Sequence, residues 1–315
     1  MKFILDTYGA DAGTLPIIKG AALALAAHPG LELVLVGNEN DIRSALGELP
    51  AGLSILHTED FISNHEPAMC IFNGRDESST AIALKHLKED PAIAGMLTAG
   101  NTGAVLVGSI FRLGLKKGLK SPALSSAIPQ AGGGYAVLVD CGANVDCTAK
   151  DLVNFAVLGS EFAGQMYGLE RPRVALLNVG KEPGKGNPLM LEAYKLLSEK
   201  EGINFIGNIE GCDISLNQAD VIVADGFTGN IVLKEVEATG KLAMKLLENA
   251  AAEDGTAETE TVRKAMAQMY SLFEMNKRGG ATFLGTAKPI VKMHGVATEE
   301  TVVACVEQLL CYFGC

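Results

Sequence analysis

Short apolar segments alternate with longer segments of helical periodicity along almost the whole chain. Apolar runs of this kind, when Gly, Asn or Asp follows them, are typical of strands that are buried on both faces. A sheet whose strands are separated by helices is mainly parallel, because each crossover helix returns the chain to the same edge. We therefore predict an α/β fold in which helices cover both faces of a mainly parallel sheet.

The same alternation predicts where the elements lie. Strands are predicted at residues 3–5, 31–36, 54–57, 95–97, 124–128, 136–139, 174–177, 203–206, 221–224 and 290–292. Helices are predicted at residues 15–27, 78–88, 102–113, 151–167, 188–200, 229–251, 259–273 and 298–310. No repeat or long linker interrupts the pattern, so residues 1–315 are predicted to form a single unit, with a length that permits two lobes.

The charge and the apolar runs exclude several classes of protein. The chain has 26 Lys and Arg against 37 Asp and Glu, a net charge of −11, which disfavours nucleic acid as a partner. No apolar run approaches the roughly 18 to 20 residues of a membrane helix, and the N-terminus lacks the pattern of a signal peptide. We therefore expect a cytoplasmic protein.

The seven cysteines indicate neither disulfides nor a metal. They are scattered, odd in number and contain no C-x-x-C pair. A disulfide framework or a structural zinc site would require a regular spacing. Most of them are therefore interpreted as small buried hydrophobic residues.

The loops after the predicted strands are unusually rich in Gly, Asn and Asp. They are Asp6 and residues 98–101, 140–144, 178–180, 207–211 and 225–230. One such loop would be explained by its turn alone, but these carry several polar side chains each. Because parallel strands end at the same edge of a sheet, we predict that the six loops converge on one ligand site.

The helix that follows Gly100 suggests what this site binds. Unpaired N–H groups of Thr102 and Gly103 at its N-terminus favour an anion, and residues 226–230 have the same placement. Phosphate is the natural candidate, while the absence of a Walker A or a dinucleotide fingerprint leaves nucleotide use without support.

Two further loops place cationic side chains near the predicted phosphate site. They are residues 182–187, with Lys185, and residues 292–295, with Lys292 and His294. Two alternatives stay open here, because Lys185 could be merely solvated and His294 could be a structural imidazole. Ser78 and Ser79 are better explained as a helix cap, with a contact to phosphate or substrate as the second interpretation.

Taken in order, these loops resemble those of the bacterial phosphate acyltransferase family. The resemblance rests on the segments 99–104 (AGNTGA), 140–146 (DCGANVD), 178–187, 204–211 (NFIGNIEG), 225–230 (DGFTGN) and 292–295 (KMHG). It implies a three-layer α/β/α architecture like that of isocitrate and isopropylmalate dehydrogenases, related to phosphotransacetylases, and a homodimer. It also implies transfer of a fatty acyl group from acyl carrier protein to inorganic phosphate in phospholipid synthesis, with neither metal nor organic cofactor.

The site residues follow from this hypothesis. The predicted catalytic residues are Lys185, Asn230, Lys292 and His294. The predicted phosphate- and substrate-binding residues are Asp6, Asp11, Ser78, Ser79, Asn101, Thr102, Gly103, Asp140, Asn144, Asp146, Glu182, Asn208, Glu210, Asp225 and Gly229. The densest basic cluster, Arg112, Lys116, Lys117 and Lys120, is predicted to dock the acidic carrier protein.

Two other functions remain open. One is a transferase for short acyl thioesters, similar to component C of glycine reductase, and the other is a non-catalytic paralogue that binds acyl carriers.

Residues 240–280 are predicted to form a helical hairpin that protrudes or lies at the dimer interface. Its turn, residues 250–261, is acidic, which disfavours peripheral contact with anionic lipid.

Overall fold

The structure, a computed structural model, describes residues 1–253, 264, 266, 267, 269, 273 and 279–315. The chain forms two compact units. The first contains Met1–Ser125, Gln165–Gly168 and Arg278–Cys315, and the second contains Ser126–Gly164 and Leu169–Lys277. Strand β5 (Ala123–Pro129) passes from the first unit into the second.

The sheet of the first unit has the strand order β3-β2-β1-β4-β11-β10-β5. Its strands are β1 (Lys2–Asp6), β2 (Glu32–Gly37), β3 (Leu53–His57), β4 (Ile93–Thr98), β10 (Ala281–Leu284), β11 (Ile290–Lys292) and the start of β5. All neighbours are parallel except β10, which is antiparallel to both β11 and β5. The carboxyl ends of β1, β2, β3, β4 and β11 therefore share one edge.

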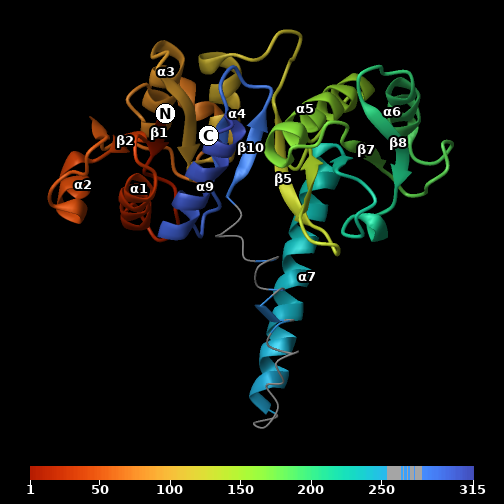
Figure 1. The fold of residues 1–315 in the computed structure, drawn as a ribbon. Helices are drawn as coiled ribbons and strands as arrows, with labels where there is room; N and C mark the ends of the chain where they lie inside the picture. Colours follow the sequence, from red (N-terminus) through yellow and green to blue (C-terminus); the bar gives the residue numbers. More distant parts are fainter. Residues whose placement is uncertain (254–263, 265, 268, 270–272, 274–278) are drawn as a thin grey trace. The chain divides into compact units, whose positions relative to one another are not determined.

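Side-chain alternation in β1 explains the layers of this unit. Phe3 and Leu5 belong to the core under helices α1 (Leu15–Ala27) and α9 (Glu299–Tyr312), which pack on each other (Figure 1). Ile4 alternates with them and is buried on the opposite face, where α3 (Ser79–Glu89) packs on β1 and β4. The remaining helices are α2 (Glu39–Leu46), η1 (Ala68–Phe72) and α4 (Thr102–Gly108), which continues into η2 (Ser109–Leu113).

The sheet of the second unit has the order β5-β6-β9-β7-β8. Strands β6 (Tyr135–Val139), β7 (Arg173–Leu177), β8 (Asn204–Ile209) and β9 (Val221–Val223) are parallel. Helix α5 (Ala149–Tyr167) packs directly on them, since a Cβ on Gly159 would lie 2.7 Å from Val221 and 2.9 Å from Val139. Helix α6 (Pro188–Ser198) packs on β8, and η3 (Gly211–Asp213) follows β8.

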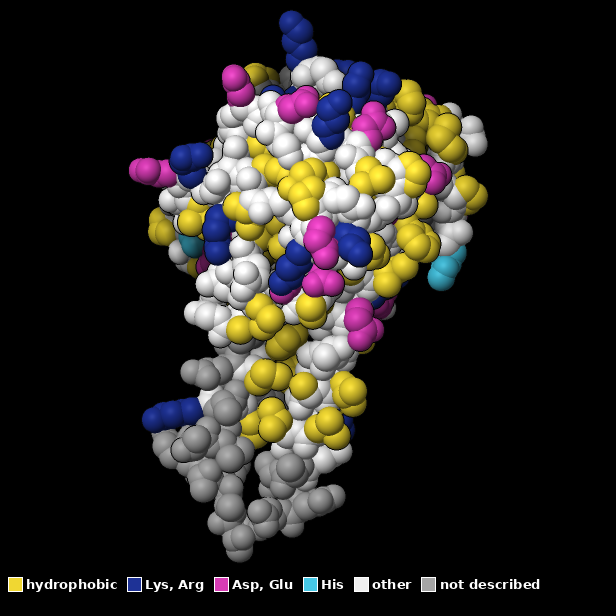
Figure 2. Space-filling view, turned by 90° about the vertical axis from the view of Figure 1, so that its right-hand side faces the viewer, with side chains coloured by type: hydrophobic (Ala, Val, Ile, Leu, Met, Phe, Trp, Pro, Cys, Tyr) yellow, Lys and Arg dark blue, Asp and Glu magenta, His cyan; other side chains and the backbone are white. Residues whose placement is uncertain are grey.

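Helix α7 (Gly226–Glu253) has 28 residues and extends far beyond the sheet of its unit (Figure 1). At 1.5 Å per residue it is about 42 Å long. Hydrophobic side chains gather along it in Figure 2, and Leu242 and Leu246 are 60% and 59% exposed. None of the described helices combines the length and apolar character needed to cross a membrane. Most of the return arm of the predicted 240–280 hairpin, including the turn and most of the predicted helix 259–273, lies outside the described residues.

The predicted α/β fold is confirmed, and several element boundaries are corrected. Strand β8 continues to Ile209 instead of ending at 206, because a register irregularity with φ of +99° at Gly207 lets it stay paired with β7. Helix α7 begins at Gly226 rather than 229, since Asp225 caps it. Helix α2 and the antiparallel strand β10 were not predicted.

Candidate functional site

Asp6, at the carboxyl end of β1, is the centre of a buried polar cluster in the first unit. Its Oδ2 accepts hydrogen bonds from Thr80 Oγ1 (2.8 Å) and Thr98 Oγ1 (3.2 Å), and its Oδ1 accepts one from the N–H of Tyr8 (3.1 Å). Burial raises the pKa of Asp6, and the hydrogen bonds from Thr80, Tyr8 and Thr98 offset only part of this rise. The cluster joins the ends of β1 and β4 to the start of α3.

Lys292, the last residue of β11, places a largely buried ammonium at the same edge. Its Nζ donates to the carbonyl oxygens of Ala99 (3.0 Å) and Met293 (2.6 Å). Burial lowers the pKa of Lys292 to about 8, although the carboxylates of Asp6 and Asp11 act in the opposite direction. An ammonium has three N–H donors, so these two bonds leave one for a further acceptor.

The first loop contacts both other loops of this edge through glycines. Gly9 has a φ of +100°, and a Cβ there would overlap the backbone of Gly100. The N–H of Asp11 donates to the carbonyl oxygen of Gly295 (2.7 Å), and a Cβ on Gly295 would lie 2.9 Å from the carboxylate of Asp11. The structure thus brings together three predicted loops, those after β1, β4 and β11.

Asn101 has a structural role that the sequence did not predict. Its Oδ1 caps α4 by accepting from the N–H of Ala104 (3.0 Å), and its Nδ2 donates to the carbonyl oxygens of Ser63 (3.0 Å) and Glu66 (2.9 Å). The side chain is buried and already engaged in these bonds, so its predicted contact with phosphate would compete with its structural role. Only the first-turn N–H groups of Thr102 and Gly103 fit the predicted anion contact.

The other predicted residues of this unit are placed less centrally. Ser78 is the N-cap of α3, but its buried Oγ donates to the carbonyl oxygen of Arg75 (2.6 Å) instead of capping the helix. Ser79 is buried at the start of α3, and its Oγ has no hydrogen-bond partner in the described part of the chain. His294 is exposed, and its Nδ1 accepts from the N–H of Val296 at 3.4 Å, so a proton would be carried on Nε2.

The second unit has its own polar edge, at the ends of β6, β7, β8 and β9. Asp140, fully buried after β6, accepts hydrogen bonds from the N–H groups of Gly142, Ala143 and Asn144 and from Asn144 Nδ2. Asp225, after β9, accepts from the N–H (2.7 Å) and Oγ1 (3.0 Å) of Thr228. These two carboxylates organise the loops on either side of the N-terminus of α7.

Small residues let α7 approach the Asp140 loop closely. The N–H of Gly226 donates to the carbonyl oxygen of Asn144 (2.7 Å), and a Cβ on Gly229 would overlap the carbonyl oxygen of Asp140. The side chain of Asn230 lies beside Gly142, 3.6 Å from the position of a Cβ there. The structure therefore brings together the predicted residues of these two loops. Asp146 is exposed and lies farther along the Asp140 loop.

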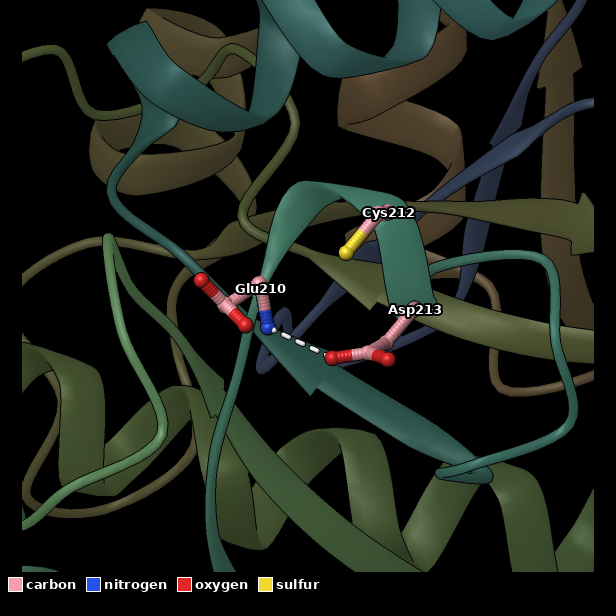
Figure 3. Close-up of side chains that lie close together, drawn as sticks. All are labelled: Glu210, Cys212 and Asp213. Atoms are coloured by element: carbon pink, nitrogen blue, oxygen red, sulfur yellow. Dashed lines mark hydrogen bonds between the residues drawn. The ribbon is translucent and has the colours of Figure 1, made fainter.

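The turn after β8 carries a cluster that can be mistaken for a metal site. Glu210, Cys212 and Asp213 lie close together in Figure 3, with ligand atoms within 4.8 Å of one another. Glu210 and Asp213 form a capping box around η3, and Lys181 Nζ lies 2.9 Å from Asp213 Oδ1. Capping and this ion pair lower the pKa of Asp213. The cluster is thus explained by local structure, and we assign no metal to it.

Comparison with known proteins identifies the family. A family model described as "Fatty acid synthesis protein" matches residues 1–310. The chain belongs to this family. Two relatives named phosphate acyltransferase come from Thermoanaerobacterium thermosaccharolyticum, 34% identical over 310 residues, and Streptococcus pneumoniae, 38% identical over 312 residues. The alignments cover 98% of this chain and 92% and 94% of the relatives.

Solved structures show that this fatty acid synthesis family member shares its fold with phosphotransacylases. A phosphotransacetylase from Streptococcus pyogenes matches with a TM-score of 0.67 at 15% identity, covering 100% of this chain and 94% of its own. A branched-chain phosphotransacylase from Enterococcus faecalis matches with a TM-score of 0.63 at 15% identity, covering 99% of each chain.

The fold explains why some residues of the candidate site could be predicted from the sequence and others could not. The polar residues at or just beyond the carboxyl end of a strand, such as Asp6, Asp140 and Asp225, could be found from the loop composition alone. Thr80 was missed, and Thr98 was placed in a polar loop but not among the site residues, because they are 74 and 92 residues from Asp6 and no local pattern connects them with it. Asn178 directly follows β7 but was left out of the predicted site residues.

Arg112 differs from the other residues of the predicted docking cluster. Its Nη2 donates to the carbonyl oxygen of Ile71 (2.6 Å) and to Asp76 Oδ1 (2.7 Å), and its guanidinium lies over the ring of Phe72. Arg112 is therefore already held by contacts within its own unit, and its predicted part in docking stays a prediction. Lys117 and Lys120 are exposed, as is Lys116, so docking at these three lysines stays a prediction.

Proposed function

We propose that this protein is a phosphate acyltransferase that transfers a fatty acyl group from acyl carrier protein to inorganic phosphate, a reaction that serves phospholipid synthesis. The family membership and the two relatives named phosphate acyltransferase, matched over more than nine-tenths of their length, support this function. Phosphate and the thioester balance the reaction by themselves, so no cofactor is required.

The observation that carries the proposal is the ammonium of Lys292 beside the N-terminus of α4. Lys292 Nζ is bonded to the carbonyl oxygen of Ala99, three residues before Thr102, the first residue of the helix. One remaining N–H of Lys292 and the first-turn N–H groups of Thr102 and Gly103 supply the donors and positive charge that a phosphate prefers. Partial burial strengthens such contacts.

The chemistry is a direct attack on the thioester. A phosphate oxygen forms a bond to the acyl carbonyl carbon, the C–S bond then breaks, and the carrier leaves as a thiolate that takes a proton from solvent or from His294. A thiolate is a good leaving group, so positioning of the two reactants and stabilisation of the oxyanion supply most of the rate. Lys185, Asn144 and Asn230 stay predicted donors to the substrates.

A direct assay tests this proposal. The purified protein is given palmitoyl-carrier protein with and without phosphate, free thiol is followed by a colorimetric reagent, and acyl phosphate is trapped with hydroxylamine. We expect thiol release that depends on phosphate and matches the trapped product. Turnover of acetyl but not palmitoyl thioesters would instead favour the short-chain transferase, and binding of the carrier without turnover would favour the non-catalytic paralogue.

We also propose that the protein is a homodimer. The exposed Leu242 and Leu246 on α7 are apolar groups that a second copy could cover. Light scattering on the purified protein measures the mass directly. A monomer at micromolar concentration would contradict the dimer without affecting the proposed reaction.

A further inference from the structure

Lys185 lies on an exposed loop, but its backbone is held on both sides by buried asparagines. Its N–H donates to the carbonyl oxygen of Glu182 (3.1 Å), and its own carbonyl oxygen accepts from Asn178 Nδ2 (3.1 Å). The Glu182 carbonyl oxygen also accepts from Asn208 Nδ2 (3.0 Å). Asn178 directly follows β7 and Asn208 lies in the neighbouring strand β8, so the sheet itself supports the turn.

Two glycines fix the same loop by leaving no room for a side chain. Gly186 has a φ of +101°, and a Cβ there would lie 2.6 Å from Asn178 Oδ1. A Cβ on Gly180 would lie 2.9 Å from Cγ of Lys185, so the stem of the lysine rests on Gly180. The loop is thus fixed by the contact of the Lys185 stem with Gly180 and by the hydrogen bonds to the carbonyl oxygens of Lys185 and Glu182.

The support of this loop includes a feature that lowers the stability of the fold, and a lysine that is only solvated would not require it. Asn208 is only 7% exposed, and its Oδ1 has no hydrogen-bond partner in the described part of the chain. A buried polar atom without a partner is unfavourable, and an apolar side chain at this position would avoid the cost. A lysine that only faces solvent gains little from a fixed backbone.

We propose that Asn178 and Asn208 are positioning residues, which fix the Glu182–Lys185 turn so that the Lys185 ammonium meets an anionic substrate from a set backbone position. A preorganised cation loses less conformational freedom on binding, so it binds phosphate more tightly than the same group on a free loop. The inference rests on the proposed function, in which Lys185 contacts phosphate, and it adds the residues through which the fold controls that contact.

A double-mutant cycle tests the inference. Lys185→Met, Asn208→Ala and the double variant are compared in kcat/KM for phosphate and in the Kd for phosphate measured by calorimetry. We expect Asn208→Ala alone to lower kcat/KM roughly tenfold, mainly through KM. In the Lys185→Met background the same change should have an effect below about twofold, because the group that Asn208 positions is already absent.

The control lies on the same strand. Asn204 Nδ2 donates to the carbonyl oxygen of Arg171 (3.3 Å) at the other end of β8, so Asn204→Ala removes a similar bond and should leave both quantities unchanged. Thermal melts confirm folding, and Asn208→Ser replaces the alanine variant if that one is unfolded.

The outcomes separate the two proposals. An equal loss from Asn208→Ala in both backgrounds, or full activity in Lys185→Met, would overturn the positioning role. A wild type that releases no thiol would overturn the proposed function instead, and the cycle in Kd would still decide whether Asn208 acts through Lys185.

Discussion

The ammonium of Lys292 predicts a distinctive dependence on pH. Burial lowers its pKa to about 8, so the protein holds the cation below that pH and loses it above. If the cation binds phosphate, kcat/KM should be level just below pH 8 and fall by about tenfold per pH unit well above it. Of the groups facing it, Asp6 and Asp11 are carboxylates, and the thiol of Cys305 has its pKa raised by burial.

Two variants make this pH profile specific. Lys292→Gln should remove the descending limb and lower activity at neutral pH, whereas Lys185→Met should lower activity and keep the limb. Initial rates are corrected for spontaneous thioester hydrolysis at each pH. A descending limb that survives in Lys292→Gln would show that another group titrates.

Replacement of Asn101 should lower the stability of the protein. Asn101→Ala removes the cap of α4 and the two bonds to the 63–66 segment, and loss of the cap alone costs about 1 kcal/mol. Asn101→Ser also loses both bonds to the 63–66 segment but keeps a side-chain oxygen that can cap the helix. We therefore expect the free energy of unfolding in urea to fall more for the alanine variant than for the serine one. Equal values would show that the cap contributes nothing.

Helix α7 depends on close backbone contact in its first turn. A Cβ on Gly229 would overlap the carbonyl oxygen of Asp140, so Gly229→Ala must move the helix or the loop and should lower the free energy of unfolding by about 2 kcal/mol or more. A Cβ on Gly211, at the start of η3, would meet nothing within 4 Å, so Gly211→Ala is the control. Denaturant unfolding of both variants compares them, and similar values would contradict the contact.

The elements differ in how far the sequence predicts them, and the reason is burial. Helix α1 was predicted at 15–27 and found at Leu15–Ala27, because its apolar residues face the core at a regular spacing. Helix α2 buries only Ile42, so it lacks that signal even though Asn38 caps it well. Strand β10 has only four residues, too few for a reliable pattern.

In the candidate site, too, residues marked by their sequence neighbours could be predicted, whereas contacts between residues far apart in the sequence could not. The acids that end β1, β6 and β9 are visible in the sequence because turn-forming residues follow them. The partners of these side chains are not visible, since Thr98 reaches Asp6 across 92 residues and Asn208 reaches Glu182 across 26. The roles of Asn101 and Asn208 as supports for backbone could therefore be assigned only from the structure.

The whole molecule has a net charge of −11, which bears on how it could receive an acidic carrier protein. Partners of like charge associate slowly unless a local patch of opposite sign guides them. Lys117 and Lys120 are exposed and follow Phe111, which is 68% exposed and packs edge-on against Phe72. An exposed aromatic residue followed within nine residues by exposed lysines would suit a carrier that is acidic and bears an acyl chain.

Charge reversal at these lysines should affect one donor far more than the other. We expect Lys117→Glu with Lys120→Glu to lower kcat/KM for palmitoyl-carrier protein roughly tenfold or more and that for palmitoyl-CoA much less. The control is Lys85→Glu with Lys88→Glu, two exposed lysines of α3 that give the same change in net charge. Salt should also slow the wild type with the carrier, because screening weakens attraction beyond about 8 Å at physiological ionic strength. Equal slowing with both donors would place the defect in the site or the fold, and an equal effect of the control pair would show that net charge, rather than this surface, governs the encounter.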